Sequence, residues 1–264
     1  MTDLLAAFLL GIIEGLTEFL PVSSTGHLLI AQHWLGARSD FFNIVIQAGA
    51  ILAITLVFRQ RLWQLAVGWR DPGNRDYIAK LALAFLVTAV VGLPVRLMGW
   101  ELPETVTPIA IALILGGVWM LWAEWRAGRL PDRDQVTWKI AVLVGLAQVV
   151  AGVFPGTSRS AAAIFMAMLA GLSRRSAATE FVFLVGIPTM FAASGYAFLE
   201  LLLEQGLGGE RWDEVGVAFL AATVTGFLVV KWLLGYIKSH RFTGFAVYRI
   251  LLGLVLLFMV PGIH

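Results

Sequence analysis

The sequence predicts an all-α polytopic membrane protein, and three observations support this prediction. Of the 264 residues, 59% are hydrophobic and only 14% are charged, and the mean hydropathy is +0.84. A soluble domain carries about a quarter charged residues, so this chain lacks the polar residues that a water-exposed surface needs. Apolar runs also recur along the whole chain, separated by short polar breaks. We therefore predict one integral membrane domain over residues 1–264, with the lipid bilayer as its surroundings.

The remaining composition excludes several classes of function. A net charge of +2 is too small to indicate a nucleic-acid partner. The chain contains no cysteine, which excludes thiolate metal sites, disulfides and cysteine nucleophiles.

The hydrophobic pattern predicts helices of two lengths. A crossing helix needs roughly 20 apolar residues, and six runs come close to or exceed that length. They are 41–58, 77–99, 106–125, 177–204, 214–237 and 243–260. Four other runs are shorter or broken, and they form two pairs: 4–20 with 24–35, and 138–154 with 159–171.

We interpret the two pairs as re-entrant helix hairpins. The first pair is joined through Pro21-Val-Ser-Ser-Thr-Gly26 and the second through Pro155-Gly-Thr-Ser-Arg159. A polar break that contains proline is tolerated at membrane depth only where it is buried in protein or lines a wet cavity. Both loops are therefore expected inside the protein.

The charges in the breaks predict an orientation. The breaks at 59–75, 126–133 and 238–241 are basic, whereas those at 101–104 and 204–214 are acidic. By the positive-inside rule the basic breaks face the cytoplasm. The first hairpin then enters from the outer face, and the second enters from the inner face.

Opposed hairpins predict an internal repeat, and the sequence contains one at an offset of 134 residues. Residues 84–92 match residues 218–226 at five of nine positions. At the same offset Ser24 pairs with Ser158 and Glu14 with Gln148. Each half, about 1–125 and 135–264, holds three crossings, so the second copy must be inverted. Sites in such folds lie near the midplane, where broken helices meet.

Glu14 and Glu18 lie on one face of an apolar helix, four residues apart. Two neighbouring carboxylates are expensive in hydrocarbon and need compensation. A magnesium or calcium ion would supply it, because both prefer oxygen ligands. The alternative is a pair of neutral acids, or of acids that reach the membrane surface.

Hydroxyl groups follow both prolines at the start of a short helix. Such positions offer side-chain caps and free backbone N–H groups that bind anions. Arg159 adds a planar cation that suits phosphate oxygens, and His27 is expected to face Glu18 across the turn. The alternatives are plain helix capping and a structural ion pair between Arg159 and Glu14 or Glu18. The candidate phosphate-binding residues are Ser23, Thr25, Gly156, Thr157, Ser158, Arg159 and Ser160.

These residues carry a resemblance to a known family. Glu14-Gly-Leu-Thr-Glu-Phe-Leu-Pro-Val-Ser-Ser-Thr-Gly-His27 resembles the first signature of the bacterial undecaprenyl-pyrophosphate phosphatase family, also called the bacitracin-resistance family. Pro155-Gly-Thr-Ser-Arg-Ser160 is similar to its second signature, and Phe245-Ala-Val-Tyr-Arg249 also fits. One departure is Ala163, where the family usually has threonine.

The resemblance implies hydrolysis of undecaprenyl pyrophosphate to undecaprenyl phosphate and inorganic phosphate, which recycles the lipid carrier for peptidoglycan and confers bacitracin resistance. It also implies a metal-dependent enzyme, an interdigitated inverted-topology repeat and a homodimer. The expected location is the bacterial inner membrane, with the active site open to the periplasm. By position, the catalytic set is Glu14, Glu18, Ser24, His27 and Arg159, with Glu14 and Glu18 as metal ligands.

The residues leave the nucleophile open. His27 can attack phosphorus, Ser24 can attack with His27 as base, or His27 can activate water. A transporter or flippase of the polyprenyl phosphate is the alternative function, because inverted repeats with broken helices are typical of transporters. The type-2 phosphatidic acid phosphatases are disfavoured, since Phe165 stands where their signature needs histidine.

Overall fold

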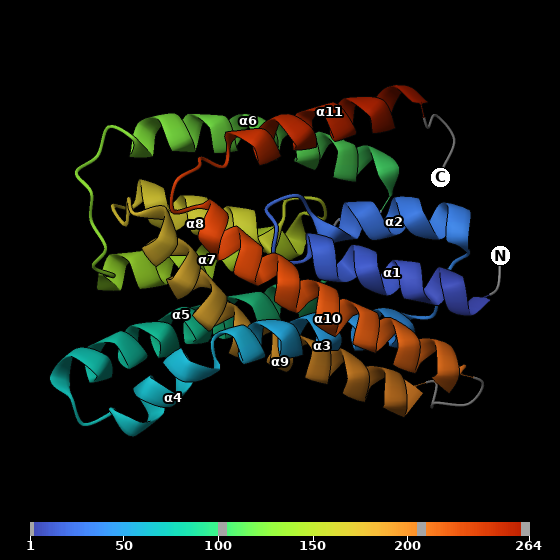
Figure 1. The fold of residues 1–264 in the computed structure, drawn as a ribbon, viewed down its shortest axis with the longest axis horizontal. Helices are drawn as coiled ribbons and strands as arrows, with labels where there is room; N and C mark the ends of the chain where they lie inside the picture. Colours follow the sequence, from blue (N-terminus) through green and yellow to red (C-terminus); the bar gives the residue numbers. More distant parts are fainter. Residues whose placement is uncertain (1–2, 100–104, 205–209, 260–264) are drawn as a thin grey trace.

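A computed structural model describes residues 3–99, 105–204 and 210–259 of the chain. The secondary structure of these residues consists of helices and the segments that connect them. Figure 1 shows the helices lying roughly along one direction. They are α1 (Asp3–Thr17), α2 (Ser24–Leu35), α3 (Asp40–Val57), α4 (Arg59–Val67), α5 (Pro72–Leu97), α6 (Val106–Ala127), α7 (Trp138–Val153), α8 (Arg159–Leu169), α9 (Arg175–Glu204), α10 (Trp212–Tyr236) and α11 (Thr243–Met259).

Five of these helices, α3, α5, α6, α9 and α10, are long and apolar enough to cross a membrane. The chain is therefore a multi-pass membrane protein, as its composition predicts. The sixth predicted crossing corresponds to α11, which has 17 residues. The predicted acidic break at 101–104, and residues 205–209 of that at 204–214, lie outside the described residues.

Two predicted helix boundaries were wrong, and one helix was missed, each for a local reason. α1 ends at Thr17 instead of residue 20, because Pro21 lacks an N–H group and disfavours helix just before it. α5 begins at Pro72 instead of residue 77, since Asp71 accepts a hydrogen bond from the Asn74 backbone and proline suits a first helical position. The prediction also missed α4, because its arginines were interpreted as a connecting segment.

The two short helix pairs enter the bundle from opposite ends. In Figure 1 α1 and α2 occupy the end that carries the N-terminus, whereas α7 and α8 begin at the other end. Their loops, residues 18–23 and 154–158, meet in the interior, where Ser160 Oγ donates a hydrogen bond to Leu20 O at 3.2 Å. The described basic breaks lie toward the end where α7 begins.

Each short pair packs against a long helix from the other half of the chain. α1 contacts α10, and α7 contacts α5. Both contacts depend on glycine: a Cβ at Gly145 would lie 2.6 Å from Ala84 O, and a Cβ at Gly11 would overlap Ala218 O. Close approach through small residues is how membrane helices gain packing energy without a hydrophobic driving force.

This packing predicts a difference between two glycines of the same helix. Gly145→Ala forces α7 away from α5 and should destabilise the protein by about 1–3 kcal/mol, as overpacking does. Gly152→Ala should leave stability unchanged, because a Cβ there meets no atom within 4 Å. Unfolding midpoints in detergent measure both. Equal midpoints would show that the α5–α7 contact does not require glycine.

Candidate active site

The site begins with two serines in an unusual backbone conformation. Ser23 has φ of 73° and Ser158 has φ of 69°, and they are the only described non-glycine residues with positive φ. Ser23 caps α2 and Ser158 caps α8. A left-handed conformation at a residue with a Cβ costs on the order of 1–3 kcal/mol and persists only where the surroundings hold it. Ser23 and Ser158 thus share one conformation and one capping role, and the Ser24–Ser158 pairing of the repeat stays a prediction.

Arg249 of α11 holds both loops. Its side chain is fully buried, and its guanidinium donates to Pro21 O of the first loop at 3.3 Å. It also donates to Gly156 O at 2.9 Å and Thr157 O at 3.0 Å in the second loop. A further bond reaches Ala112 O of α6 at 3.3 Å. One buried side chain therefore joins the two loops and α6.

The loops are joined a second time by Glu18. Its Oε1 accepts a hydrogen bond from Arg159 Nη2 at 2.8 Å, and its Oε2 accepts one from Ser24 Oγ at 2.5 Å. Glu18 is 5% exposed, whereas the Arg159 side chain is 30% exposed. The structural ion pair that was left as an alternative is thus present, but Arg159 still reaches the cavity described next.

A polar cavity of about 300 Å³ lies between the loops, within the range of small-molecule sites. The first helical turns of α2 and α8 both open onto it, so the positive ends of two helix dipoles converge there. Two arginines and one glutamate add a net positive charge, which suits an anion. The lining residues are Glu18, Ser23, Ser24, Thr25, Gln47, Arg96, Ala151, Gly152, Pro155, Gly156, Ser158 and Arg159.

His27 does not face Glu18, and that prediction was wrong. Its Nδ1 lies 2.7 Å from Ser23 O, and its Nε2 lies 2.6 Å from the Tyr248 hydroxyl. A carbonyl oxygen only accepts, so Nδ1 carries the proton and Nε2 of the neutral ring accepts from Tyr248. The imidazole braces the backbone of Ser23 rather than lining the cavity.

Glu14 and Gln148, which the sequence predicts to be counterparts, share one property. Glu14 Oε2 and Gln148 Nε2 are buried without a hydrogen-bond partner among the described residues. A buried carboxylate oxygen without a donor needs a cation or a proton. In the described part of the chain, no group of three or more His, Asp or Glu residues gathers to hold a metal. A metal would therefore have only the two predicted carboxylates, Glu14 and Glu18, as protein ligands of this kind.

The other predicted phosphate-binding residues divide into two groups. Five of them line the cavity, namely Ser23, Thr25, Gly156, Ser158 and Arg159. Thr157 and Ser160 are absent from that lining: Thr157 borders an apolar groove against α6, and Ser160 contacts Leu20 O and lies 3.0 Å from Ser158 Oγ.

Three further residues at the site, Arg96, Gln47 and Tyr248, are not among those that the sequence predicts. Arg96 lies near the end of α5, where an arginine is common at the membrane interface. Gln47 of α3 lines the cavity and also accepts a hydrogen bond from Ser194 Oγ at 2.9 Å. Tyr248 belongs to the segment Phe245-Ala-Val-Tyr-Arg249, which is the one signal in the sequence that pointed to it.

The chain is similar in sequence to known proteins over almost its whole length. Residues 7–255 match the family described as Bacitracin resistance protein BacA. The chain belongs to this family. A relative from Stenotrophomonas maltophilia (strain K279a) is 76% identical over 262 residues, covering 99% of each chain, and is named undecaprenyl-diphosphatase. A relative from Xanthomonas campestris pv. campestris (strain 8004) with the same name is 72% identical, covering 99% of this chain and all of the relative.

Membership of this family confirms the resemblance drawn from the two signatures. At the one departure, Ala163 is fully buried in α8 and belongs to the main hydrophobic cluster of the described residues. The position where the family usually has threonine is thus filled by an apolar contact in this chain.

Proposed function

We infer that this chain is an undecaprenyl-diphosphatase, which hydrolyses undecaprenyl pyrophosphate to undecaprenyl phosphate and inorganic phosphate. The observation that carries this inference is the cavity in which Ser24, Glu18 and Arg159 meet in front of two helix N-termini. The names of relatives that match almost the whole chain agree with it. The description of the family names bacitracin resistance.

A diphosphate suits this cavity for electrostatic reasons. Its terminal phosphate can accept hydrogen bonds from Arg159 and from the free N–H groups at the start of α2 and α8. Glu18 keeps the guanidinium of Arg159 in place at 2.8 Å. Donors that are fixed before the substrate arrives stabilise the charge that develops in the transition state, at no cost of reorganisation.

We propose that Ser24 is the nucleophile. Its Oγ attacks the terminal phosphorus while its proton passes to Glu18 Oε2, and the bond from that phosphorus to the bridging oxygen breaks, releasing undecaprenyl phosphate. Water then hydrolyses the phosphoserine to give inorganic phosphate and restore Ser24. Support comes from the 2.5 Å hydrogen bond from Ser24 to Glu18, because a nucleophile and its base must lie within hydrogen-bond reach. His27 acts as a positioning residue through Ser23.

A magnesium or calcium ion remains part of the proposal. Glu14 and Glu18 would hold it, and substrate phosphate oxygens and water would complete the shell, as is usual for magnesium at phosphoryl-transfer sites. The unpartnered Glu14 Oε2 supports this assignment. The ion would neutralise charge on the diphosphate.

We also propose an inverted-topology repeat, with the two short helix pairs as re-entrant hairpins. The contacts of Gly11 with Ala218 and of Gly145 with Ala84 support it, because both partners are shifted by the same 134 residues. Under this proposal the protein lies in the bacterial inner membrane as a homodimer, with its cavity open to the periplasm.

Phosphate release by the purified protein tests the inferred activity. In detergent with magnesium or calcium, the wild type should release phosphate from undecaprenyl pyrophosphate, and a chelator should stop it. Glu18→Gln and Arg159→Met should each lower kcat/KM by about 10²–10³, the usual effect of removing a fixed transition-state contact.

A matched control is the ion pair between Arg61 and Glu180, at 3.0 Å and outside the cavity. Arg61→Met and Glu180→Gln should leave kcat/KM unchanged. Undiminished release by the Glu18 and Arg159 variants would contradict the assigned site. A wild type that moves the lipid across vesicles without releasing phosphate would favour the flippase instead.

The nucleophile can be identified by trapping a phosphoenzyme with substrate labelled at its terminal phosphate. Phosphoserine survives acid and phosphohistidine does not, so acid-stable label should form in the wild type and in His27→Gln. Ser24→Ala should carry none. Acid-labile label that disappears in His27→Gln would make His27 the nucleophile.

A further inference from the structure

An apolar groove leads away from the polar cavity between α5, α7 and α9. Its volume is about 380 Å³, and it shares Arg96, Gly152 and Arg159 with the cavity. Two of the residues that line it, Leu93 and Tyr196, are 46% and 37% exposed. The groove therefore connects the phosphate site with the bilayer.

The walls of this groove suit a hydrocarbon chain. Its two threonines turn their hydroxyls to helix carbonyls: Thr88 Oγ1 donates to Ala84 O at 2.9 Å, and Thr189 Oγ1 donates to Val185 O at 2.8 Å. Only their methyl groups are left for a ligand. The other side chains between its ends are mostly Ala, Val, Leu and Phe.

Polar and cationic side chains line the part of the groove that borders the cavity. Arg96 lines both the groove and the cavity, with its guanidinium 4.8 Å from the centre of the Tyr196 ring and 2.8 Å from Glu200. Gln148 also lines the groove, is 6% exposed, and has an Nε2 donor without a partner among the described residues. An unpaired buried donor in a groove that two arginines also line fits an anionic oxygen.

We propose that this groove binds the first isoprene units of the lipid, and that Arg96 and Gln148 bind the phosphate that stays on the lipid. The proposal rests on the inferred hydrolysis, and it assigns the two phosphates to different groups. Arg159 and the helix N-termini hold the terminal phosphate, whereas Arg96 and Gln148 hold the one that leaves with the chain.

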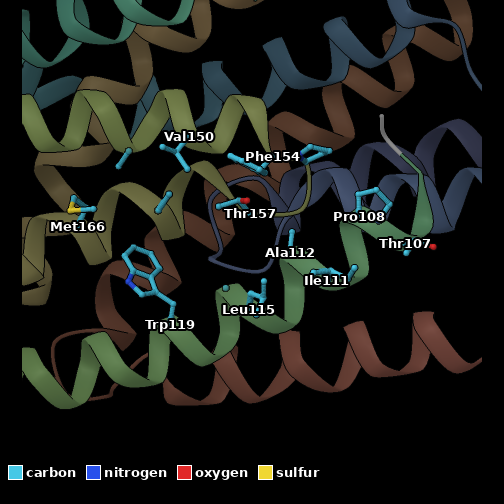
Figure 2. A pocket seen from close by; sticks show the side chains of 14 residues that line it. Thr107, Pro108, Ile111, Ala112, Leu115, Trp119, Val150, Phe154, Thr157 and Met166 are labelled. Atoms are coloured by element: carbon cyan, nitrogen blue, oxygen red, sulfur yellow. The ribbon is translucent and has the colours of Figure 1, made fainter. Parts of the chain in front are cut away.

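A second apolar groove lies on the other side of α7, and the two grooves differ in the charge of the side chains that line them. Figure 2 shows Ile111, Leu115 and Trp119 of α6 facing Val150 and Met166 across it. Its volume is larger, about 630 Å³, but no charged side chain lines it and it shares only Pro155 with the cavity. A diphosphate lipid therefore meets charged side chains in the first groove only.

Neighbouring residues of α7 allow a matched test, because Val149 lines the first groove and Val150 lines the second. Val149→Phe should raise the KM for undecaprenyl pyrophosphate about tenfold. This increase in KM is moderate because the isoprene chain enters the groove from detergent rather than from water. The groove therefore stabilises the bound lipid through packing contacts alone. Inorganic pyrophosphate, which has no chain, should inhibit this variant with an unchanged Ki. Val150→Phe should change neither constant.

Arg96→Met tests the polar end, and it should raise both the KM for the lipid and the Ki for pyrophosphate, whereas Arg61→Met should change neither. Ala193→Leu, on the opposite wall, should reproduce the effect of Val149→Phe.

An equal KM in Val149→Phe and Val150→Phe, or a larger one in Val150→Phe, would overturn the groove assignment. Loss of pyrophosphate inhibition in Val149→Phe would overturn it too. If the wild type releases no phosphate, the inferred hydrolysis fails, and competition binding of the same lipid to both variants still decides the groove.

Discussion

The buried guanidinium of Arg249 is the contact on which the candidate site depends. Placing a charge in a low-dielectric interior is costly unless it is hydrogen-bonded. Here four backbone carbonyls accept from the two terminal nitrogens of Arg249, whereas its Nε has no partner among the described residues. These carbonyls belong to both loops and to α6, so the side chain fixes three segments at once. Each carbonyl left without its donor would cost about 1–3 kcal/mol. The left-handed Ser23 and Ser158 lie next to these anchored positions.

The two loops together bring a hydroxyl, a carboxylate and a guanidinium group to one cavity, and neither loop provides all three alone. The first loop supplies the hydroxyl and the carboxylate, Ser24 and Glu18, whereas the second supplies Arg159. Because the two short helix pairs enter the bundle from opposite ends, the first turns of α2 and α8 both border the cavity. An anion between them meets two helix dipoles and a fixed cation. The hydrophobic chain attached to that anion then needs a path to the bilayer, which the groove beside α5 offers.

Much of the fold and of the candidate site could be predicted from the sequence, because charged residues are rare within apolar membrane segments and are easy to recognise there. The long helices follow from apolar length, and Glu18 and Arg159 stood out as charges inside apolar segments. Contacts between distant segments could not be predicted: spacing along one turn suggested that His27 faces Glu18, but Tyr248, more than two hundred residues away, holds the imidazole. Arg96 gave no signal either, since an arginine near a helix end is ordinary.

Hydrogen exchange in the two loops, followed by mass spectrometry, tests most directly whether Arg249 joins them. Peptides covering residues 18–25 and 154–160 should exchange slowly in the wild type and in Arg61→Met, and faster together in Arg249→Met. The long helices α3, α5 and α10 should keep their protection in all three proteins. Unchanged exchange in Arg249→Met, or faster exchange in only one loop, would contradict the account.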